Sequence, residues 1–426
     1  MYAFAVTVGA LVPSKLRNKV EWLLRRAEGA LLPPDVLAGP GRHLDPDGAR
    51  LALRFASDDM DIAGAAATER LDLLLRAESD HAEKERYVAS YGICGVRRFE
   101  AQRARIFQIA VETFPRHVNN VYLVLEGGSS LLFDCGSGLP TSERDLALGF
   151  AIVAAVFGED VGRGEIETCV VSHAHVDHWG GVNVLRRTSR TQVAVHELDA
   201  RVIERFDEHV AAATRERERL WARAGVPSLD RSAMRDLYDE GKRHFRAERV
   251  DTILRDQDLV GSGYRVHHAP GHRPGLVCLQ VHDVLLTSDH VLARGTPRQL
   301  PRAFEPRAGL ARYLESLEKI RCVEGIRLAL AGHEEPIPDL AARITEIERS
   351  CHVRLERVLA VCEIPRSVHE IARELFGEQE GRRAIDAIDD AAAYVEHLET
   401  IGRLHADVSG ASADSVIRYV TRAGAG

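Results

Sequence analysis

Four side chains that commonly bind metal ions lie within six residues of one another near the middle of the chain. They are His173, His175, Asp177 and His178. Packing alone explains this group poorly, because burying imidazoles and a carboxylate together without partners costs several kcal/mol. Alternating spacing puts His173 and His175 on one side of an extended segment, and a turn after them can aim Asp177 and His178 at a neighbouring point. Imidazole and carboxylate suit zinc and other borderline divalent metals, so the segment predicts a metal site.

The elements that must position this segment are short strands with turn signals, which begin at about Phe99. Thr168–Ser172 is predicted as a buried strand that leads directly into the His-rich segment, and Gly127-Gly128 joins two other strands in a hairpin. The remaining predicted strands are Ile106–Glu112, Val121–Glu126, Ser130–Cys135, Gln192–His196, Tyr264–His268, Leu276–Val281, Val284–Thr287 and Arg327–Ala331, with a helix near Asp145–Val156. Strands in mixed order with hairpins and intervening helices favour an α/β sandwich over a strict βαβ repeat.

A long, charged, helix-forming stretch between Glu197 and Val250 separates two strands that flank the His-rich segment, with breaks at Gly225-Val-Pro227 and Gly241. Two interpretations stay open for it. It is either a solvated helical hairpin on the surface or a cap over the site. In the second case the apolar side of the cap is expected to consist of Trp221, Leu229, Met234, Leu237, Tyr238 and Phe245.

The chain is helical again after about Arg343. Ile344–Val361 has apolar residues at helical spacing, a capping box opens Val368–Phe376 at Ser367, and Asp386–Leu398 makes a third helix. Short runs around Leu404 and Val416–Val420 complete a predicted winged helix. From Arg343 to the end there are 11 Arg and 15 Asp or Glu, a balance of −4. A DNA-reading module carries a basic stripe, so packing or dimerisation is favoured and no nucleic-acid partner is expected.

Length and composition describe a globular protein of two or three domains: 426 residues with a net charge of −8. We predict an N-terminal extension of unknown role at 1–98, a catalytic domain at 99–342 and the winged-helix-like domain at 343–426. The extension includes the amphipathic stretches Ser14–Arg26 and Ala67–Tyr87. No apolar run is long enough to span a bilayer and no export signal is evident, so no membrane contact is expected. Seven scattered Cys are typical of a reducing compartment, and the expected location is cytoplasmic.

The segment His173-Ala-His-Val-Asp-His178 after a strand resembles the H-x-H-x-D-H signature of the metallo-β-lactamase superfamily. Four further motifs occur in the order that this family shows. Their centres are Asn120-Val-Tyr-Leu and Leu132-Phe-Asp134-Cys-Gly136 upstream, then His272 in a Pro-Gly-His turn, Asp289 after a strand, and His333 in an Ala-Gly-His loop. The resemblance covers roughly residues 104–340 and implies an αββα sandwich. The C-terminal region resembles the winged-helix tail of several such hydrolases, and nothing comparable covers the first 98 residues.

The resemblance implies a site for two metal ions, residue by residue. His173, His175 and His272 would hold the first ion, Asp177, His178 and His333 the second, and Asp289 would bridge them. Asp134 would support the His loop, and Asp177 would also assist proton transfer to the leaving group. Two zinc ions per chain are expected, with iron and manganese as alternatives, and the nucleophile would be a hydroxide bridging the metals.

Three positions depart from the family pattern: Arg273 stands where Thr or Ser is common, Cys135 replaces a Thr, and His290 follows the bridging Asp. Arg273 would either bind an anionic group of the substrate or form a salt bridge to a nearby carboxylate. Cys135 is expected to be a small buried hydrophobic residue. His267, His268 and His290 are candidates for contacts to the substrate or to the metal ligands, although structural roles are the more common for such histidines.

The superfamily catalyses several reactions, so its fold does not fix the substrate. The favoured reaction is hydrolysis of a thioester or related acyl ester, because the motif spacing is similar to that of glyoxalase II-like enzymes and an apolar cap suits an acyl chain. One alternative is an endoribonuclease or phosphodiesterase, against which the acidic C-terminal region argues. Another is an iron-dependent persulfide dioxygenase with a single metal. Hydrolysis of lactones or β-lactams stays open, and a homodimer is one role for the C-terminal region.

Overall fold

The computed structural model describes residues 95–302, 304–407 and 415–422. The chain divides into two compact units, and one of them comprises residues 86–146 and 161–426. This unit contains all the residues of the candidate site. Helix α7 (Pro140–Phe157) begins in this unit and ends in the other. The two predicted N-terminal helical stretches lie outside the described residues.

A seven-stranded sheet forms one layer of the unit, in the order β1 to β7. Its strands are β1 (Val96–Ala101), β2 (Ala104–Phe114), β3 (His117–Glu126), β4 (Ser129–Phe133), β5 (Thr168–Val171), β6 (Gln192–His196) and β7 (Thr252–Leu254). The first four strands are antiparallel neighbours joined by hairpins, whereas β4 to β7 run parallel. Strand β5 is buried at three of its four residues, as expected for a strand that enters the His-rich segment.

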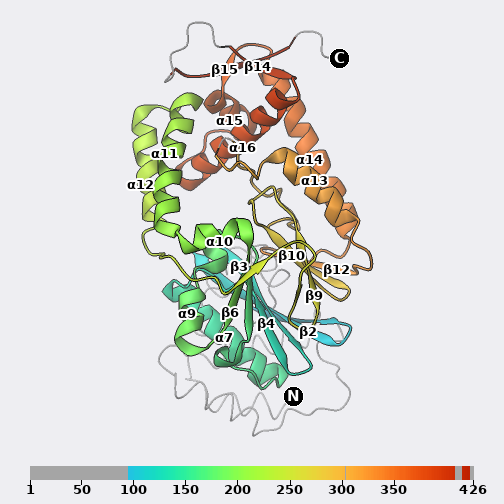
Figure 1. The fold of residues 1–426 in the computed structure, drawn as a ribbon. Helices are drawn as coiled ribbons and strands as arrows, with labels where there is room; N and C mark the ends of the chain where they lie inside the picture. Colours follow the sequence, from blue (N-terminus) through green and yellow to red (C-terminus); the bar gives the residue numbers. More distant parts are fainter. Residues whose placement is uncertain (1–94, 303, 408–414, 423–426) are drawn as a thin grey trace, which may run out of the picture. The chain divides into compact units, whose positions relative to one another are not determined.

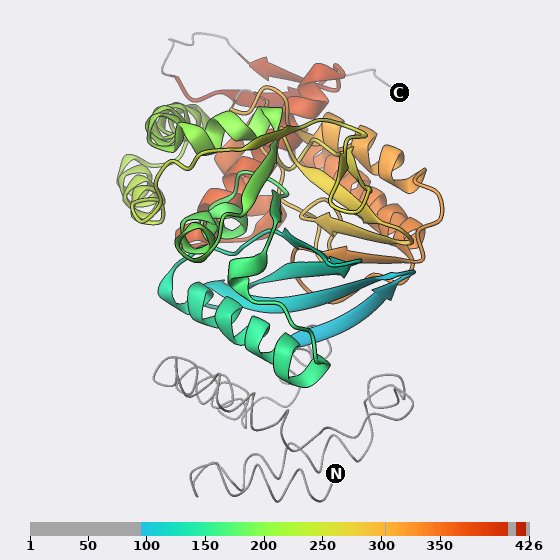
Figure 2. The same cartoon turned by 60° about the horizontal axis from the view of Figure 1, so that its bottom comes forward.

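A five-stranded sheet forms the second layer, in the order β12-β11-β10-β9-β8 (Figure 2). Its strands are β8 (Leu259–Val260), β9 (Tyr264–His268), β10 (Val277–Val281), β11 (Val284–Ser288) and β12 (Leu328–Ala331). Apolar residues from both sheets form one core, including Tyr122, Phe133 and Val170 from the first sheet and Leu279 and Leu286 from the second. The predicted α/β sandwich is therefore confirmed, and the predicted strands begin and end within four residues of their observed bounds.

Helices α13 (Leu310–Arg321) and α14 (Leu340–Val361) pack on the other face of the second sheet (Figure 1). Three short elements connect strands of the first sheet along the chain. The 3-10 turn η2 (Arg163–Glu165) precedes β5, and the helices α8 (Val176–Trp179) and α9 (Val182–Thr188) lie between β5 and β6. Across the described part of the chain, no helix combines the length and the apolar character needed to cross a membrane.

The stretch between β6 and β7 folds into three helices: α10 (Glu197–Glu204), α11 (Phe206–Ala224) and α12 (Ser228–Glu240). The predicted break lies where expected, since Gly225 ends α11 with a φ of +84°. The prediction was wrong for two residues of the expected apolar face, because Leu229 is 84% exposed and Leu237 is 39% exposed. Met234 and Tyr238 are one helical turn apart and face inward, while Leu229 lies on the opposite side of α12 from Met234. The other expected members of that face, Trp221 and Phe245, are buried.

The C-terminal region contains α15 (Val368–Phe376), α16 (Gly381–Thr400) and a small sheet in the order β13-β15-β14. Its strands are β13 (Arg366–Ser367), β14 (Leu404–Asp407) and β15 (Arg418–Thr421). The predicted capping box is present, with Ser367 and Glu370 each accepting a hydrogen bond from the other's backbone. The helices and the hairpin lie where the sequence places them, and the winged-helix assignment stays a prediction.

The helices α11 and α12 pack against α16 in a shared apolar core (Figure 1). A buried ion pair crosses this contact, with Arg217 Nη1 2.5 Å from Asp389 Oδ2. The guanidinium of Arg217 also stacks over the rings of Tyr238 and Phe304, at 4.8 and 4.5 Å. The C-terminal helix α16 therefore supports the inserted helices, which are not a free hairpin in solvent.

Asp389→Ala should destabilise the protein, because it leaves Arg217 buried without its partner. Breaking a buried pair costs about 3–5 kcal/mol. The free energy of unfolding, measured with urea, is expected to fall by that amount. The matched control is Arg219→Gln on the same helix, which removes an exposed pair with Glu216 and should leave stability almost unchanged. Equal stabilities of the two variants would contradict this account.

Candidate metal centre

The candidate site lies where several strands end. Strand β5 ends at Val171, the chain bends at His173 and Ala174, and His175 is extended, with φ −80° and ψ 137°, immediately before helix α8. Strands β11 and β12 are parallel neighbours, so Asp289 and His333 follow them at the same edge of the sheet. Gly332 permits this approach, because a Cβ there would lie 2.4 Å from Asp289 Oδ1. His272 comes from the turn after β9.

Three imidazoles and one carboxylate form the first cluster: His173, His175, His272 and Asp289. His175 Nδ1 lies 2.9 Å from His173 Nε2 and 3.0 Å from His272 Nε2. His272 Nε2 lies 3.6 Å from Asp289 Oδ2. Four donor atoms therefore converge on one point, which is the arrangement that a tetrahedral metal ion requires.

The second cluster lies on the other side of Asp289. Asp289 Oδ1 is 3.6 Å from His178 Nε2 and 3.3 Å from His333 Nε2. Asp177 Oδ2 is 3.4 Å from His178 Nε2 and 3.9 Å from His333 Nε2. The two oxygens of Asp289 therefore face different clusters. All seven side chains that the sequence predicted as ligands are brought together.

Two residues near Asp177 were missed from the sequence. The amide of Asn119 donates to Asp177 Oδ2 at 3.1 Å and lies 3.2 Å from His178 Nε2. His117 Nε2 lies 3.1 Å from Asp177 Oδ2, and its ring is 4.6 Å from that of His333. Both come from strand β3, which starts far from the His-rich segment in the sequence. The sequence motif at Asn120 predicted the strand, but nothing in the sequence indicated that the residues before Asn120 contact Asp177.

Asp134 holds the His-rich segment from behind, as the sequence predicted. Its carboxylate accepts hydrogen bonds from the backbone N–H of Ser172 at 2.7 Å and from the Ser172 hydroxyl at 2.8 Å. Its Oδ2 also lies 2.8 Å from His178 Nδ1, so it turns the opposite nitrogen of His178 toward the cluster. Asp134 adopts a φ of +64°, a left-handed conformation uncommon outside glycine.

Backbone carbonyls orient two other imidazoles in the same manner. His272 Nδ1 lies 2.7 Å from the carbonyl of Arg298, and His333 Nδ1 lies 2.8 Å from that of Val118. Asp199, on α10, was missed from the sequence. It is fully buried and accepts hydrogen bonds from the backbone N–H groups of Ala174 and Gly275, which ties the His-rich segment to the turn that follows His272.

Electrostatics differ between the two clusters. Burial and the neighbouring imidazoles lower the pKa of His173 and of His175 well below the usual value, and burial lowers that of His272 to about 4. These imidazoles are therefore neutral at physiological pH, as metal ligands must be. Burial opposes charge at His178 too, but Asp289, Asp134 and Asp177 together raise its pKa well above the usual value.

The residues that depart from the family pattern have structural partners. Arg273 Nη1 forms a buried salt bridge with Glu305 Oε1 at 2.6 Å, which is one of its two expected roles. Cys135 is buried beside the carbonyl of His178, as expected. His267 Nε2 lies 2.9 Å from Gln280 Oε1 and His268 Nε2 lies 2.8 Å from the carbonyl of Pro274. His290 is buried against the ring of Tyr313.

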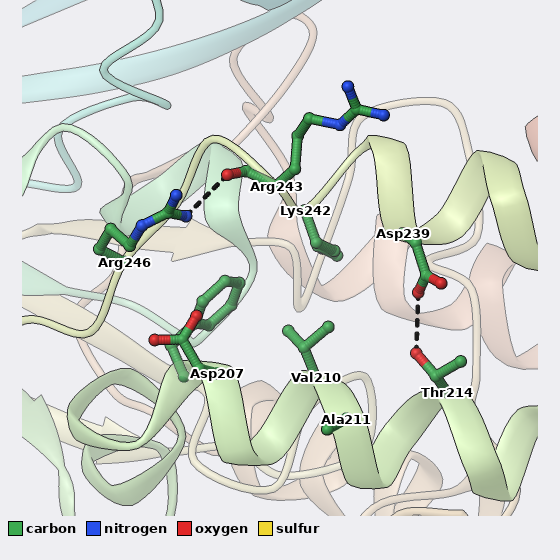
Figure 3. A pocket seen from close by; sticks show the side chains of 9 residues that line it. Asp207, Val210, Ala211, Thr214, Asp239, Lys242, Arg243 and Arg246 are labelled. Carbon is green, nitrogen blue, oxygen red and sulfur yellow. Dashed lines mark hydrogen bonds between the residues drawn. The ribbon is translucent and has the colours of Figure 1, made fainter.

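Two hollows adjoin the helices that follow β6. One, of about 660 Å³ including space open to solvent, lies between α11 and the end of α12 (Figure 3). Asp207, Val210 and Thr214 line it on one side and Asp239 on the other, and it contains none of the clustered side chains. The second hollow, of about 460 Å³ including space open to solvent, is lined in part by His175 and Ala174. The second hollow is therefore the one next to the candidate metal centre.

The sequence matches the profile of the metallo-beta-lactamase superfamily over residues 115–358. A lactamase-like protein from Neosartorya fischeri is 25% identical over 277 residues, which cover 61% of this chain and 66% of the relative. The chain thus spans slightly less than two thirds of that relative's length. The atrochrysone carboxyl ACP thioesterase of Aspergillus fumigatus is 25% identical over 294 residues, or 68% of this chain and 70% of the relative.

Two crystal structures share the fold. A beta-lactamase domain protein from Burkholderia ambifaria has a TM-score of 0.62 and 24% identity, covering 76% of this chain and 94% of its own. A metallo-beta-lactamase family protein from Thermus thermophilus has a TM-score of 0.61 and 24% identity, covering 74% of this chain and 98% of its own. Both structures are less than 25% identical in sequence to this chain, so these likenesses show the architecture alone.

His175→Ala should remove metal and abolish activity while leaving the fold largely intact, because His175 supplies a donor atom at the centre of the first cluster. Elemental analysis of the purified variant is expected to show a loss of about one ion per chain relative to the wild type. Circular dichroism reports the fold. The control is His352→Ala, an exposed histidine on α14, which should retain all of its metal. An unchanged metal content in His175→Ala would refute the assignment of the first cluster.

Asp134→Ala should weaken metal binding without removing a donor atom, because Asp134 only orients His178 and the segment before it. Loss of such a partner typically costs 10–100-fold in metal affinity. Competition with a chromogenic chelator measures this affinity. Asp251→Asn is the control, since Asp251 is hydrogen-bonded to Arg186 and to the backbone of Val193 instead. Equal affinities in wild type and Asp134→Ala would show that Asp134 has no positioning role.

Proposed function

The chain belongs to the metallo-beta-lactamase superfamily, and from this membership we propose that it is a hydrolase that uses two metal ions, with zinc expected, to cleave a thioester or a related acyl ester. The observation that carries the proposal is that Asp289 belongs to two donor groups, one with His173, His175 and His272 and one with His178 and His333, and that Asp177 lies beside the second group. The similarity to an ACP thioesterase supports the choice of substrate class.

The donor atoms fit a pair of borderline divalent ions. The first set offers three imidazoles and one carboxylate oxygen, and the second offers two imidazoles with one oxygen each from Asp177 and Asp289. Asp289 Oδ1 is buried and makes no hydrogen bond within the described part of the chain, and the imidazoles of His178 and His333 lie 3.6 and 3.3 Å from it, so a metal ion held by these three groups would give this oxygen a direct partner. When bound, two such ions supply Lewis acidity, which polarises a carbonyl and lowers the pKa of nearby water.

Asp177 is the residue that we propose to move a proton during the reaction. His178 and His117 hold its pKa well below the usual range despite its burial, so it is a carboxylate that can accept a proton from water. Asn119 fixes the orientation of Asp177 by donating to its Oδ2. In the overall reaction, oxygen from water bonds to the acyl carbon, the carbon–sulfur bond breaks, and the thiolate leaves with the bonding electron pair.

Thioesters suit this site because their leaving group needs little help. A thiol with a pKa of about 8.5 leaves as the thiolate, whereas an alcohol or amine must be protonated. Among the described residues, Asp177 and His117 are the groups placed to transfer protons beside the second cluster, and no separate acid is required. The hollow that reaches His175 lies next to the first cluster, and the rest of the substrate would extend toward it.

The proposal is tested by comparing two substrates with the zinc-loaded protein. Acetyl-pantetheine hydrolysis is followed by thiol release, and bis(p-nitrophenyl) phosphate hydrolysis by nitrophenolate absorbance. We expect kcat/KM for the thioester to exceed that for the phosphodiester, and Asp177→Asn to lower kcat for the thioester by about 100-fold or more. Faster cleavage of the phosphodiester would favour the phosphodiesterase alternative. Oxygen consumption with a persulfide substrate by an iron-containing preparation would favour the dioxygenase.

A further inference from the structure

The hollow that reaches His175 is lined by an unusual number of cations. Five basic side chains contribute to its wall, and they come from separate parts of the sequence. Arg217 lies on α11, Lys242 follows α12, Arg273 follows His272, Arg298 precedes α13, and Arg382 lies on α16. Phe206, Tyr238 and Phe304 supply an aromatic part of the same wall.

The carboxylates nearby do not balance these charges. Arg217 pairs with Asp389, Arg273 with Glu305 and Arg298 with Asp386. Arg382 shares the same Asp386 at 3.5 Å. Among the described residues, no carboxylate lies within ion-pair distance of Lys242. The four arginines therefore share three paired carboxylates, and Lys242, whose pKa is lowered to about 7, adds a partial positive charge to the wall.

Arg273 has unused hydrogen-bond donors as well. Its side chain is 4% exposed, and only Nη1 has a partner, Glu305. Nε and Nη2 are buried with no hydrogen-bond acceptor in the described structure. An unsatisfied buried donor costs about 1–3 kcal/mol, so it marks a place where a ligand supplies an acceptor. Burial and the neighbouring Arg382 lower the pKa of Lys242, which also lines the hollow, to about 7, so an anion bound there would stabilise its charged form.

We propose that this hollow binds an anionic group, phosphate or carboxylate, of the thioester substrate while the reacting carbonyl lies at the metal clusters. The inference rests on the proposed function only for the identity of the thioester. Arginine N–H groups match the oxygens of both anions, and a cleft with an excess of one charge raises the local concentration of the opposite one. The aromatic part of the wall contacts the uncharged atoms between the two ends.

This assignment gives the C-terminal region a part in substrate binding. Arg382 is about half exposed at the N-terminal end of α16, and it lines the hollow together with residues from α11 and the segment after α12. The ion pair between Arg217 and Asp389 connects the same elements. The region that the sequence assigned to packing or dimerisation therefore contributes Arg382 to the wall of this hollow.

Binding of thioethers tests the inference without requiring catalysis, because thioethers are not hydrolysed. Calorimetry of the zinc-loaded full chain compares three probes: S-ethyl-pantetheine, S-ethyl-phosphopantetheine and S-(3-carboxypropyl)-pantetheine. We expect at least one anionic probe to bind at least about tenfold more tightly than the neutral one. The phosphorylated probe reports an anion on the thiol part of the substrate, and the carboxylated probe reports one on the acyl part.

Lys242→Gln and Arg382→Gln should each reduce this preference to less than about threefold. Arg243→Gln is the matched control, since Arg243 follows Lys242 directly but lines only the other hollow (Figure 3). Arg243 pairs with Glu240 instead. The Arg243→Gln variant should keep the wild-type preference. Equal binding of all three probes to the wild type would overturn the inference, as would an unchanged preference in both Lys242→Gln and Arg382→Gln.

The result is separate from that of the hydrolysis assay. A preference for anionic probes in a protein that cleaves no thioester would support the anion site and reject the proposed reaction. Thioester hydrolysis with no preference for either anionic probe would support the reaction and reject the anion site.

Discussion

The position of one carboxylate, that of Asp289, constrains the rest of the site. Its Oδ2 faces His272 and its Oδ1 faces His178 and His333, so one side chain belongs to both donor sets. Against the effect of burial, His333 and His178 hold the pKa of Asp289 well below the usual range. A buried carboxylate with this division of oxygens requires cationic partners on both sides, and protonated imidazoles and metal ions both satisfy that need.

The fold satisfies this constraint through strand ends and outer hydrogen bonds. Strands β11 and β12 run parallel, which places Asp289 and His333 at one edge, and Gly332 leaves room for the carboxylate. Asp134 and Asp199 fix the segment that carries His173 and His175 from two sides. The inserted helices and α16 lie beyond, held together by the Arg217–Asp389 pair, and they form the wall of the hollow that reaches His175.

Local patterns in the sequence predicted most of this arrangement. Four of the seven clustered side chains lie within six residues, and the strands around them have clear apolar runs and turn signals. The other three became candidates through family motifs and not through spacing. Asn119, His117 and Asp199 could not be found, because their contacts depend on which strands and helices become neighbours in three dimensions. The exposure of Leu229 was missed for a related reason, since composition does not say which face of α12 meets α11. The partner of Arg273, Glu305, lies 32 residues away in a segment without a predicted element.

The most direct test of two donor sets sharing Asp289 is anomalous diffraction from a crystal of the metal-loaded protein, recorded at the absorption edge of the bound metal. We expect two anomalous peaks on opposite sides of the Asp289 carboxylate. One should lie among His173, His175 and His272, and the other among Asp177, His178 and His333. A single peak bound by one set alone, or peaks that lie away from Asp289, would contradict the assignment of a shared two-metal centre.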